Sequence, residues 1–225
     1  MNRTSESRHT LVCTHGWKHD ESVWNGLAGH LGAELDLHTW DLPEHGAEGP
    51  LSRPDEPVRF ELVERLDQKL DDVDSDPVIL VGHSLGGYVS LAHALAQPDR
   101  AIGLVLLSTG PGFSKSEARE QWNQWACENA DPERPNQHRL VFHDDSEVLD
   151  RLSEIDLPTL VLVGERDKRF AAAREVFAAK LSTVESDVIA GAGHNVHLTH
   201  PAVVAEHIVR WLTSMFPDRE VPTQY

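Results

Sequence analysis

The chain has 225 residues, which is enough for one domain with a full hydrophobic core. Its formal net charge of −17 argues against nucleic acid or an anionic membrane as a partner. The longest aliphatic run, at residues 104–107, is far below the roughly 18 residues that a membrane helix needs. The polar N-terminus, residues 1–9, has no apolar signal-peptide core, so we expect a cytoplasmic protein.

The acidic charge has two explanations that the sequence leaves open. A strongly hydrated acidic surface, with arginine far more frequent than lysine, fits a salt-adapted host. Genome composition would produce the same arginine excess. Folding measured against salt concentration separates the two, because full stability in dilute buffer contradicts salt adaptation.

Six short segments with apolar or alternating patterns are predicted as β-strands. They cover residues 10–14, 35–40, 78–81, 101–107, 159–163 and 184–189. Helices are predicted between and after them, over residues 20–31, 57–73, 85–97, 169–181 and 201–216. Asp20 is the expected N-cap of the first helix. This alternation of strands and helices predicts an α/β fold, with a mostly parallel sheet and helices on both faces.

The alternation breaks over residues 113–156. This stretch is polar, contains a proline-bearing turn at residues 131–135, and carries Trp122 and Trp125 three residues apart. We expect two or three helices here that form a short insertion over a pocket. The tryptophans are candidates for the wall of a substrate pocket, and packing of the insertion against the core explains the same spacing equally well.

One stretch joins a predicted strand to a predicted helix through a tight turn. The apolar residues 78–81 run directly into Gly82-His83-Ser84-Leu85-Gly86. A serine at the apex of such a turn adopts a strained backbone so that its Oγ clears the sheet. Glycine on both sides avoids a collision with the neighbouring strand or helix. The amide of Leu85 is left free at a helix N-terminus, where it can stabilise an oxyanion.

Strand, Gly-x-Ser-x-Gly and helix in this order resemble the nucleophile elbow of the α/β-hydrolase superfamily. His15-Gly16-Trp17 after the first strand is a second point of resemblance. Asp41-Leu-Pro-Glu-His-Gly46 is similar to the family's Asp-x-x-Gly-His-Gly loop, with Glu44 where glycine is usual. In this family the loop after the first strand supplies the other oxyanion amide. The resemblance therefore implies backbone amides of Trp17 and Leu85 as the oxyanion hole.

The resemblance also sets the expected architecture. Only nine residues precede the first predicted strand, too few for the antiparallel pair that usually opens this fold. We therefore predict a trimmed sheet of about six strands that lacks the first strand or strands. Residues 1–112 and 157–225 are expected to form the core domain, and residues 113–156 a small helical cap.

A serine nucleophile needs a base, and the base needs a carboxylate that fixes its tautomer. In α/β-hydrolases the acid and then the histidine follow the serine along the chain. Asp167 comes just after the fifth predicted strand and His194 just after the last, at the sheet edge where open α/β folds build their sites. Glu165 is the competing acid, and the family's Gly-x-x-Asp spacing favours Asp167.

His194, His197 and His200 are spaced three residues apart, which superficially suggests metal ligation. No acidic or cysteine ligand stands at a supporting spacing, and the family's Gly-x-Gly-His pattern already accounts for His194. We therefore expect no metal and no organic cofactor. His197 and His200 are expected to cap the final helix or to pack near it.

Together these motifs predict a serine hydrolase that uses the triad Ser84, Asp167 and His194 on a small or medium carboxylic ester. A C–C bond hydrolase or lyase of the menaquinone-pathway type, or an acyl-carrier or thioester hydrolase, is the alternative on the same triad. His15, Gly16 and His83 lie beside these motifs and join the tryptophans as candidate pocket residues. The expected partner is a small-molecule substrate. The acyl and alcohol groups and the oligomeric state do not follow from the sequence.

Overall fold

A computed structural model of the protein describes residues 9–32, 35–53, 56–73, 77–134 and 136–217. Residues 1–8, on which the expectation about a signal peptide rests, and Pro135 of the cap lie outside the described residues. Among the described residues, no helix combines the length and the apolar character needed to cross a membrane.

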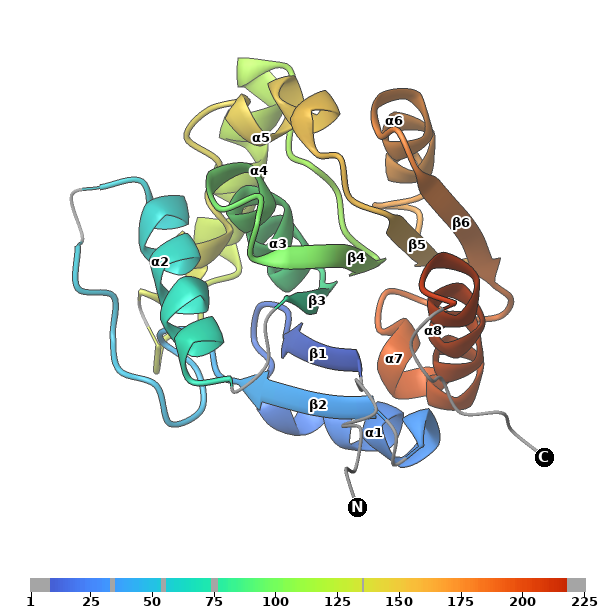
Figure 1. Cartoon of the computed structure of the whole chain (residues 1–225). Coiled ribbons are helices and arrows are strands. Elements are labelled where there is room, and N and C mark those ends of the chain that lie inside the picture. Colours follow the sequence, from blue (N-terminus) through green and yellow to red (C-terminus); the bar gives the residue numbers. More distant parts are fainter. Residues whose placement is uncertain (1–8, 33–34, 54–55, 74–76, 135, 218–225) are drawn as a thin grey trace.

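Six strands form a single sheet in the order β2-β1-β3-β4-β5-β6, and every neighbouring pair is parallel (Figure 1). The strands are β1 (His9–Thr14), β2 (Leu35–Trp40), β3 (Val78–His83), β4 (Ala101–Leu107), β5 (Thr159–Gly164) and β6 (Val184–Ile189). Because all strands run the same way, the loops after β1, β3, β5 and β6 lie at one edge of the sheet.

The sheet is covered on both faces because its strands point alternate side chains into two separate cores. Along β3, Val78 and Leu80 belong to one core, whereas Ile79 and Val81 belong to the other. This alternation follows from the two-residue period of a strand. It also explains why the central strands consist of continuous apolar runs in the sequence. The predicted fold class is confirmed.

One face carries α2 (Val58–Asp71), α3 (Leu85–Ala96) and α6 (Ala173–Lys180), which contribute to the first core. The other face carries the 3-10 turn η1 (Glu21–Trp24) with α1 (Asn25–Leu31), α7 (Val196–Thr199) and α8 (Pro201–Met215). Figure 1 shows the two groups on opposite sides of the sheet.

The structure modifies two of the predicted helices. The first begins as a 3-10 turn, and Asp20 is its N-cap as expected, because its Oδ1 accepts a hydrogen bond from the Ser22 amide at 2.9 Å. The helix predicted from residue 169 begins only at Ala173. The preceding residues form turns that hold Phe170 against the ring of His194. The short helix α7 was not predicted.

Between β4 and β5 the chain forms α4 (Ser116–Glu128), η2 (Gln137–Val141), α5 (Glu147–Asp150) and η3 (Leu152–Glu154). The indole of Trp122 donates to the Val141 carbonyl at 2.6 Å, which ties α4 to η2. Arg59 on α2 pairs with Asp145 and Glu147 at 2.6 and 2.5 Å. The ion pairs of Arg59 hold the stretch against α2, and α5 and η3 contact α3. Its treatment as a separate cap of residues 113–156 stays a prediction.

Candidate active site

Ser84 lies at the apex of the turn between β3 and α3, with φ 52° and ψ −113°. This conformation is costly for a residue with a side chain, so the surrounding structure must impose it. A Cβ on Gly82 would lie 2.4 Å from the Gly86 carbonyl oxygen, and one on Gly86 would lie 2.0 Å from that of Thr14. The Gly-x-Ser-x-Gly spacing is therefore required by backbone packing around the turn.

The backbone amides of Trp17 and Leu85 lie beside this turn, and neither has a protein acceptor in the described part of the chain. Leu85 is the first residue of α3, where amides lack partners within the helix. Trp17 lies in the loop after β1, and the neighbouring Gly16 approaches Ser84 so closely that a Cβ there would be 3.3 Å from the serine Cβ. Their role as an oxyanion hole stays a prediction.

Asp167 and His194 form a hydrogen bond across the loops after β5 and β6. The Nδ1 of His194 donates to Asp167 Oδ2 at 2.8 Å, so a neutral His194 ring carries its lone pair on Nε2. The Asp167 side chain is 4% exposed and that of His194 is 38% exposed. Burial raises the pKa of Asp167, but the hydrogen bond and charge of His194, with smaller contributions from Ser108 and the Phe170 amide, outweigh burial, and the pKa is lowered.

Glu165, the competing acid, points elsewhere. Its Oε2 accepts a hydrogen bond from the Gly191 amide at 2.7 Å, in the loop that leads to His194. Glu165 therefore supports the loop backbone, and Asp167 is the acid that binds the His194 imidazole.

His83, the residue before Ser84, contacts His194. The Nε2–H of His83 donates to the His194 carbonyl at 3.1 Å, and the two rings are 4.8 Å apart. The ring of Phe170 stacks on His194 from another side at 5.2 Å. Among the described residues no hydrogen bond joins the Ser84 hydroxyl to His194. Catalytic hydrogen bonds are often long before substrate binds.

A cavity of about 620 Å³ opens beside Ser84, between the core and the stretch proposed as the cap. Its lining is mainly apolar and aromatic, and includes Leu85, Tyr88, Trp122, Trp125, Phe142 and Phe170. The volume falls in the range of sites for small organic ligands. Both candidate tryptophans thus face the space into which Ser84 also opens.

The other candidate pocket residues, His15, Gly16 and His83, are not part of this lining. His15 and His83 are 0% and 1% exposed because they fill the space beneath the turn. A Cβ added to Gly16 would lie only 2.7 Å from His83 Nδ1. These residues support the loops of the site from below. Their position next to the catalytic motifs in the sequence did not show whether they line the pocket or support it.

Two buried histidines fasten the loop after β1 to the loop after β2. His15 donates from Nδ1 to the Gly16 carbonyl and accepts from the Leu42 amide at Nε2, at 2.8 and 3.0 Å. His45 donates to the Pro43 carbonyl and accepts from the Lys18 amide, also at 2.8 and 3.0 Å. Burial lowers the pKa of His45 to about 4 and lowers that of His15. Both rings therefore act as neutral connectors.

Three residues near the site were missed by sequence reasoning. Thr109 donates from Oγ1 to the Ser84 carbonyl at 2.6 Å and braces the turn. Phe170 covers His194, and the guanidinium of Arg169 lies 4.3 Å from the ring of Trp125. The position of Thr109 just after a central strand was a usable signal. Nothing in the sequence distinguished Arg169 and Phe170 from helix residues.

Residues 11–207 match the family model described as "Alpha/beta hydrolase family". The chain belongs to the alpha/beta hydrolase family. This confirms the family inferred from the motifs around Ser84, and the match spans most of the chain, including the loops that carry Asp167 and His194.

Relatives of this alpha/beta hydrolase include proteins named pimeloyl-[acyl-carrier protein] methyl ester esterase. The one from Nitrosospira multiformis is 35% identical over 122 residues, covering 52% of this chain and 43% of the relative. The one from Salmonella heidelberg is 33% identical over 112 residues, covering 50% and 40%. The matched segments thus span less than half the length of these curated relatives.

Solved structures show the same fold over nearly the whole chain. MenH from S. aureus has a TM-score of 0.78 at 22% identity, covering 94% of this chain and 96% of that one. A thermophilic esterase from Thermogutta terrifontis has a TM-score of 0.76 at 22% identity, covering 92% and 90%. At this level of identity the likeness concerns the fold alone.

Proposed function

We propose that the protein is a serine hydrolase that cleaves small or medium carboxylic esters through Ser84, His194 and Asp167. The observation that carries the proposal is the 2.8 Å hydrogen bond between Asp167 and His194 at the sheet edge where Ser84 is held on its strained turn. A neutral imidazole in this tautomer leaves Nε2 as the proton acceptor that a serine hydroxyl needs.

In the proposed reaction, Ser84 Oγ attacks the ester carbonyl carbon while its proton passes to His194 Nε2. The carbonyl oxygen becomes an oxyanion that accepts hydrogen bonds from the Trp17 and Leu85 amides. Collapse of this intermediate breaks the bond to the alcohol, which takes the proton from His194. Water then attacks the acyl-enzyme with His194 again as the base, and the carboxylic acid leaves. Asp167 stabilises the imidazolium in both halves.

The proposed substrate class rests on the cavity and on the relatives. An apolar, aromatic wall accepts an acyl chain, and a cavity of about 620 Å³ suits a small or medium one. We take residues 113–156 as a cap, because Trp122 and Trp125 from this stretch form part of that wall. The curated relatives are named as methyl ester esterases, which supports an ester as the scissile bond.

A fluorophosphonate probe and a series of p-nitrophenyl esters test the proposal. Wild-type protein is expected to be labelled and to hydrolyse short and medium esters, and Ser84→Ala is expected to lose both. His194→Ala is expected to lower turnover about as much as Ser84→Ala, by roughly 10³-fold or more. A folded wild type that is neither labelled nor active on esters contradicts the proposal. Near-normal turnover by His194→Ala reassigns the base.

The same panel separates the alternative chemistries on this triad. Acyl-thioesters turned over much faster than the matching esters would reassign the enzyme as a thioester hydrolase. Labelling of Ser84 without turnover of either substrate would favour cleavage of a C–C bond.

A further inference from the structure

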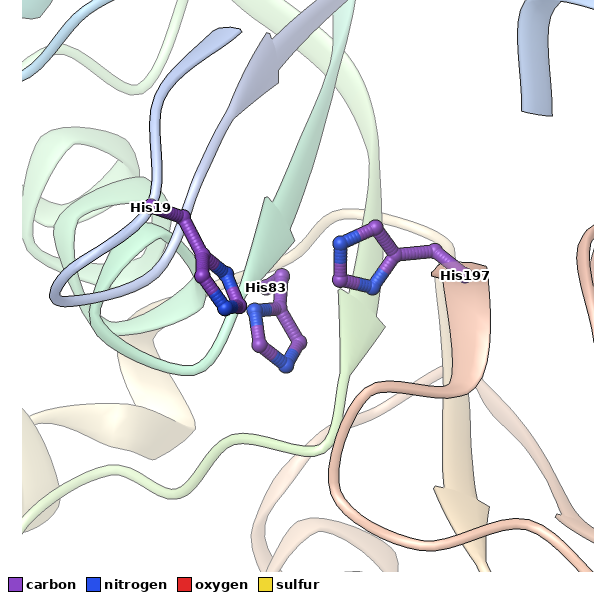
Figure 2. Close-up of side chains that lie close together, drawn as sticks. All are labelled: His19, His83 and His197. Carbon is purple, nitrogen blue, oxygen red and sulfur yellow. The ribbon is translucent and has the colours of Figure 1, made fainter. Parts of the chain in front are cut away.

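Three histidines from distant segments converge behind the turn that carries Ser84. His19 belongs to the loop after β1, His83 is the last residue of β3, and His197 lies on α7. One ring nitrogen from each lies within 4.8 Å of the corresponding atoms of the other two. Figure 2 shows the ring of His83 between those of His19 and His197.

Four of the six ring nitrogens of this group, called here the His19–His83–His197 cluster, lack among the described residues the partners that buried polar atoms normally have. His83 and His197 are 1% and 0% exposed. Among the described residues, neither nitrogen of His197, nor Nδ1 of His83, nor Nδ1 of His19 has a hydrogen-bond partner. Each unpartnered buried nitrogen costs free energy, so the arrangement calls for a ligand that all three rings can share.

His83 is also held in the tautomer that a metal ligand requires. Its Nε2 carries the hydrogen, because it donates to the His194 carbonyl at 3.1 Å. In the neutral ring Nδ1 is therefore left with a free lone pair. A histidine that binds a metal through one nitrogen and donates to a backbone carbonyl through the other is the usual arrangement around protein metal ions.

We propose that the His19–His83–His197 cluster binds one divalent transition-metal ion of the zinc type, with water as the fourth ligand. Ligand nitrogens around tetrahedral zinc lie about 3.4 Å apart, so the rings need to close in by up to roughly 1 Å each. The His19 ring, which is stacked on His83 with an interplanar angle of 17°, also has to turn so that its lone pair points at the same ion. Three imidazoles without a carboxylate suit Zn²⁺, Co²⁺ or Ni²⁺ and not Mg²⁺ or Ca²⁺. The net charge of −17 raises the local concentration of any divalent cation.

This site contains none of the three residues of the proposed hydrolytic triad. It is expected to hold together three segments of the chain. A metal ion there would connect the loop after β1, the end of β3 and α7, whose histidine rings already contact one another. Binding to the folded state alone raises its stability by mass action.

Cobalt titration of the full-length, chelator-treated protein tests the proposal. One equivalent of Co²⁺ is expected to produce visible absorption bands of a nitrogen-coordinated tetrahedral ion, and Zn²⁺ is expected to displace it and to raise Tm. His19→Phe and His197→Phe are expected to weaken binding at least roughly 100-fold. The control is His38→Phe, which removes an exposed histidine that pairs with Asp36.

Ring-nitrogen NMR of wild-type protein provides a readout that does not depend on the folding of any variant. One equivalent of Zn²⁺ is expected to shift the signals of His19, His83 and His197 and to leave that of His38 in place. No stoichiometric binding, or equal binding by the cluster variants and the control, overturns the proposal. Ser84→Ala is expected to bind metal normally, so loss of hydrolysis does not affect this test.

Discussion

At the scale of single residues, the site depends on which ring nitrogen of each histidine carries the proton. His194 donates from Nδ1 to Asp167, and His83 donates from Nε2 to the His194 carbonyl. The first tautomer leaves a base at Nε2, and the second leaves a free Nδ1 in the cluster behind the turn. His194 and His83 thus have opposite tautomers, because the acceptor of His194 lies next to its Nδ1 and the acceptor of His83 lies next to its Nε2.

Asp167→Asn is the sharpest residue-scale test of the proposed triad. An amide cannot hold His194 in the required tautomer or stabilise its charged form, so kcat is expected to fall by roughly 10³- to 10⁴-fold with the fold intact. The matched control is Glu165→Gln, which changes the neighbouring acid that accepts from the Gly191 amide. Steady-state ester hydrolysis measures both variants. A larger loss in Glu165→Gln than in Asp167→Asn would exchange the roles of the two acids.

At the scale of elements, the β3-turn-α3 unit positions Ser84 because three backbone segments approach one another at van der Waals distance. The start of α3 approaches the last residues of both β3 and β1, with glycine at each point of contact. Thr109, just after β4, adds a side-chain hydrogen bond to the turn. The strain at Ser84 is therefore balanced by packing from three strands.

Gly86→Ala tests this packing. The added Cβ would lie 2.0 Å from the Thr14 carbonyl oxygen, so the free energy of unfolding is expected to fall by about 3 kcal/mol or more. Gly29→Ala is the control, because Gly29 lies within α1 and, apart from the backbone of that helix and the adjacent residues, no atom lies within 4 Å of the added Cβ. It is expected to stabilise the protein by about 0.5–1 kcal/mol. Urea unfolding measures the free energy of unfolding of both variants. Similar values for Gly86→Ala and Gly29→Ala would contradict the view that the close approach of Gly86 to Thr14 requires glycine.

At the scale of the whole molecule, buried neutral histidines link folding to pH. His45 and His143 both have their pKa lowered to about 4, in each case chiefly by burial. His45 faces His15, Asp41 and Arg134, and of these only the Asp41 carboxylate favours its charged form. The folded state therefore resists protonation at these rings, whereas the unfolded chain accepts protons near pH 6.5.

Stability is accordingly expected to fall as pH drops. Above pH 6.5 His45 is neutral in both states and contributes no pH dependence. Between pH 6.5 and about 4 the unfolded state binds the extra proton, so the free energy of unfolding decreases by up to about 1.4 kcal/mol per pH unit for each such histidine. Below about pH 4 this contribution levels off.

Urea unfolding of His45→Gln between pH 7 and 4 measures the contribution of this ring. The variant has no imidazole to protonate, so its stability is expected to depend less steeply on pH than that of the wild type. His38→Gln, at an exposed histidine, is the control. Equal slopes in all three proteins would show that His45 does not resist protonation in the folded state.

The sequence by itself determined the fold class, the six strands, and the loops after β3, β5 and β6 that carry Ser84, Asp167 and His194. It could do so because strand periodicity and the glycines of a strained turn are local requirements, and because parallel strands end at one sheet edge.

Only the tertiary structure decided which side chains meet. It separated Asp167 from Glu165 by their hydrogen-bond partners and placed His15, Gly16 and His83 beneath the turn. It also brought His19 and His197, far apart in the chain, to the ring of His83. Such contacts depend on how loops and short helices pack, and packing of this kind leaves no periodic signal in a sequence.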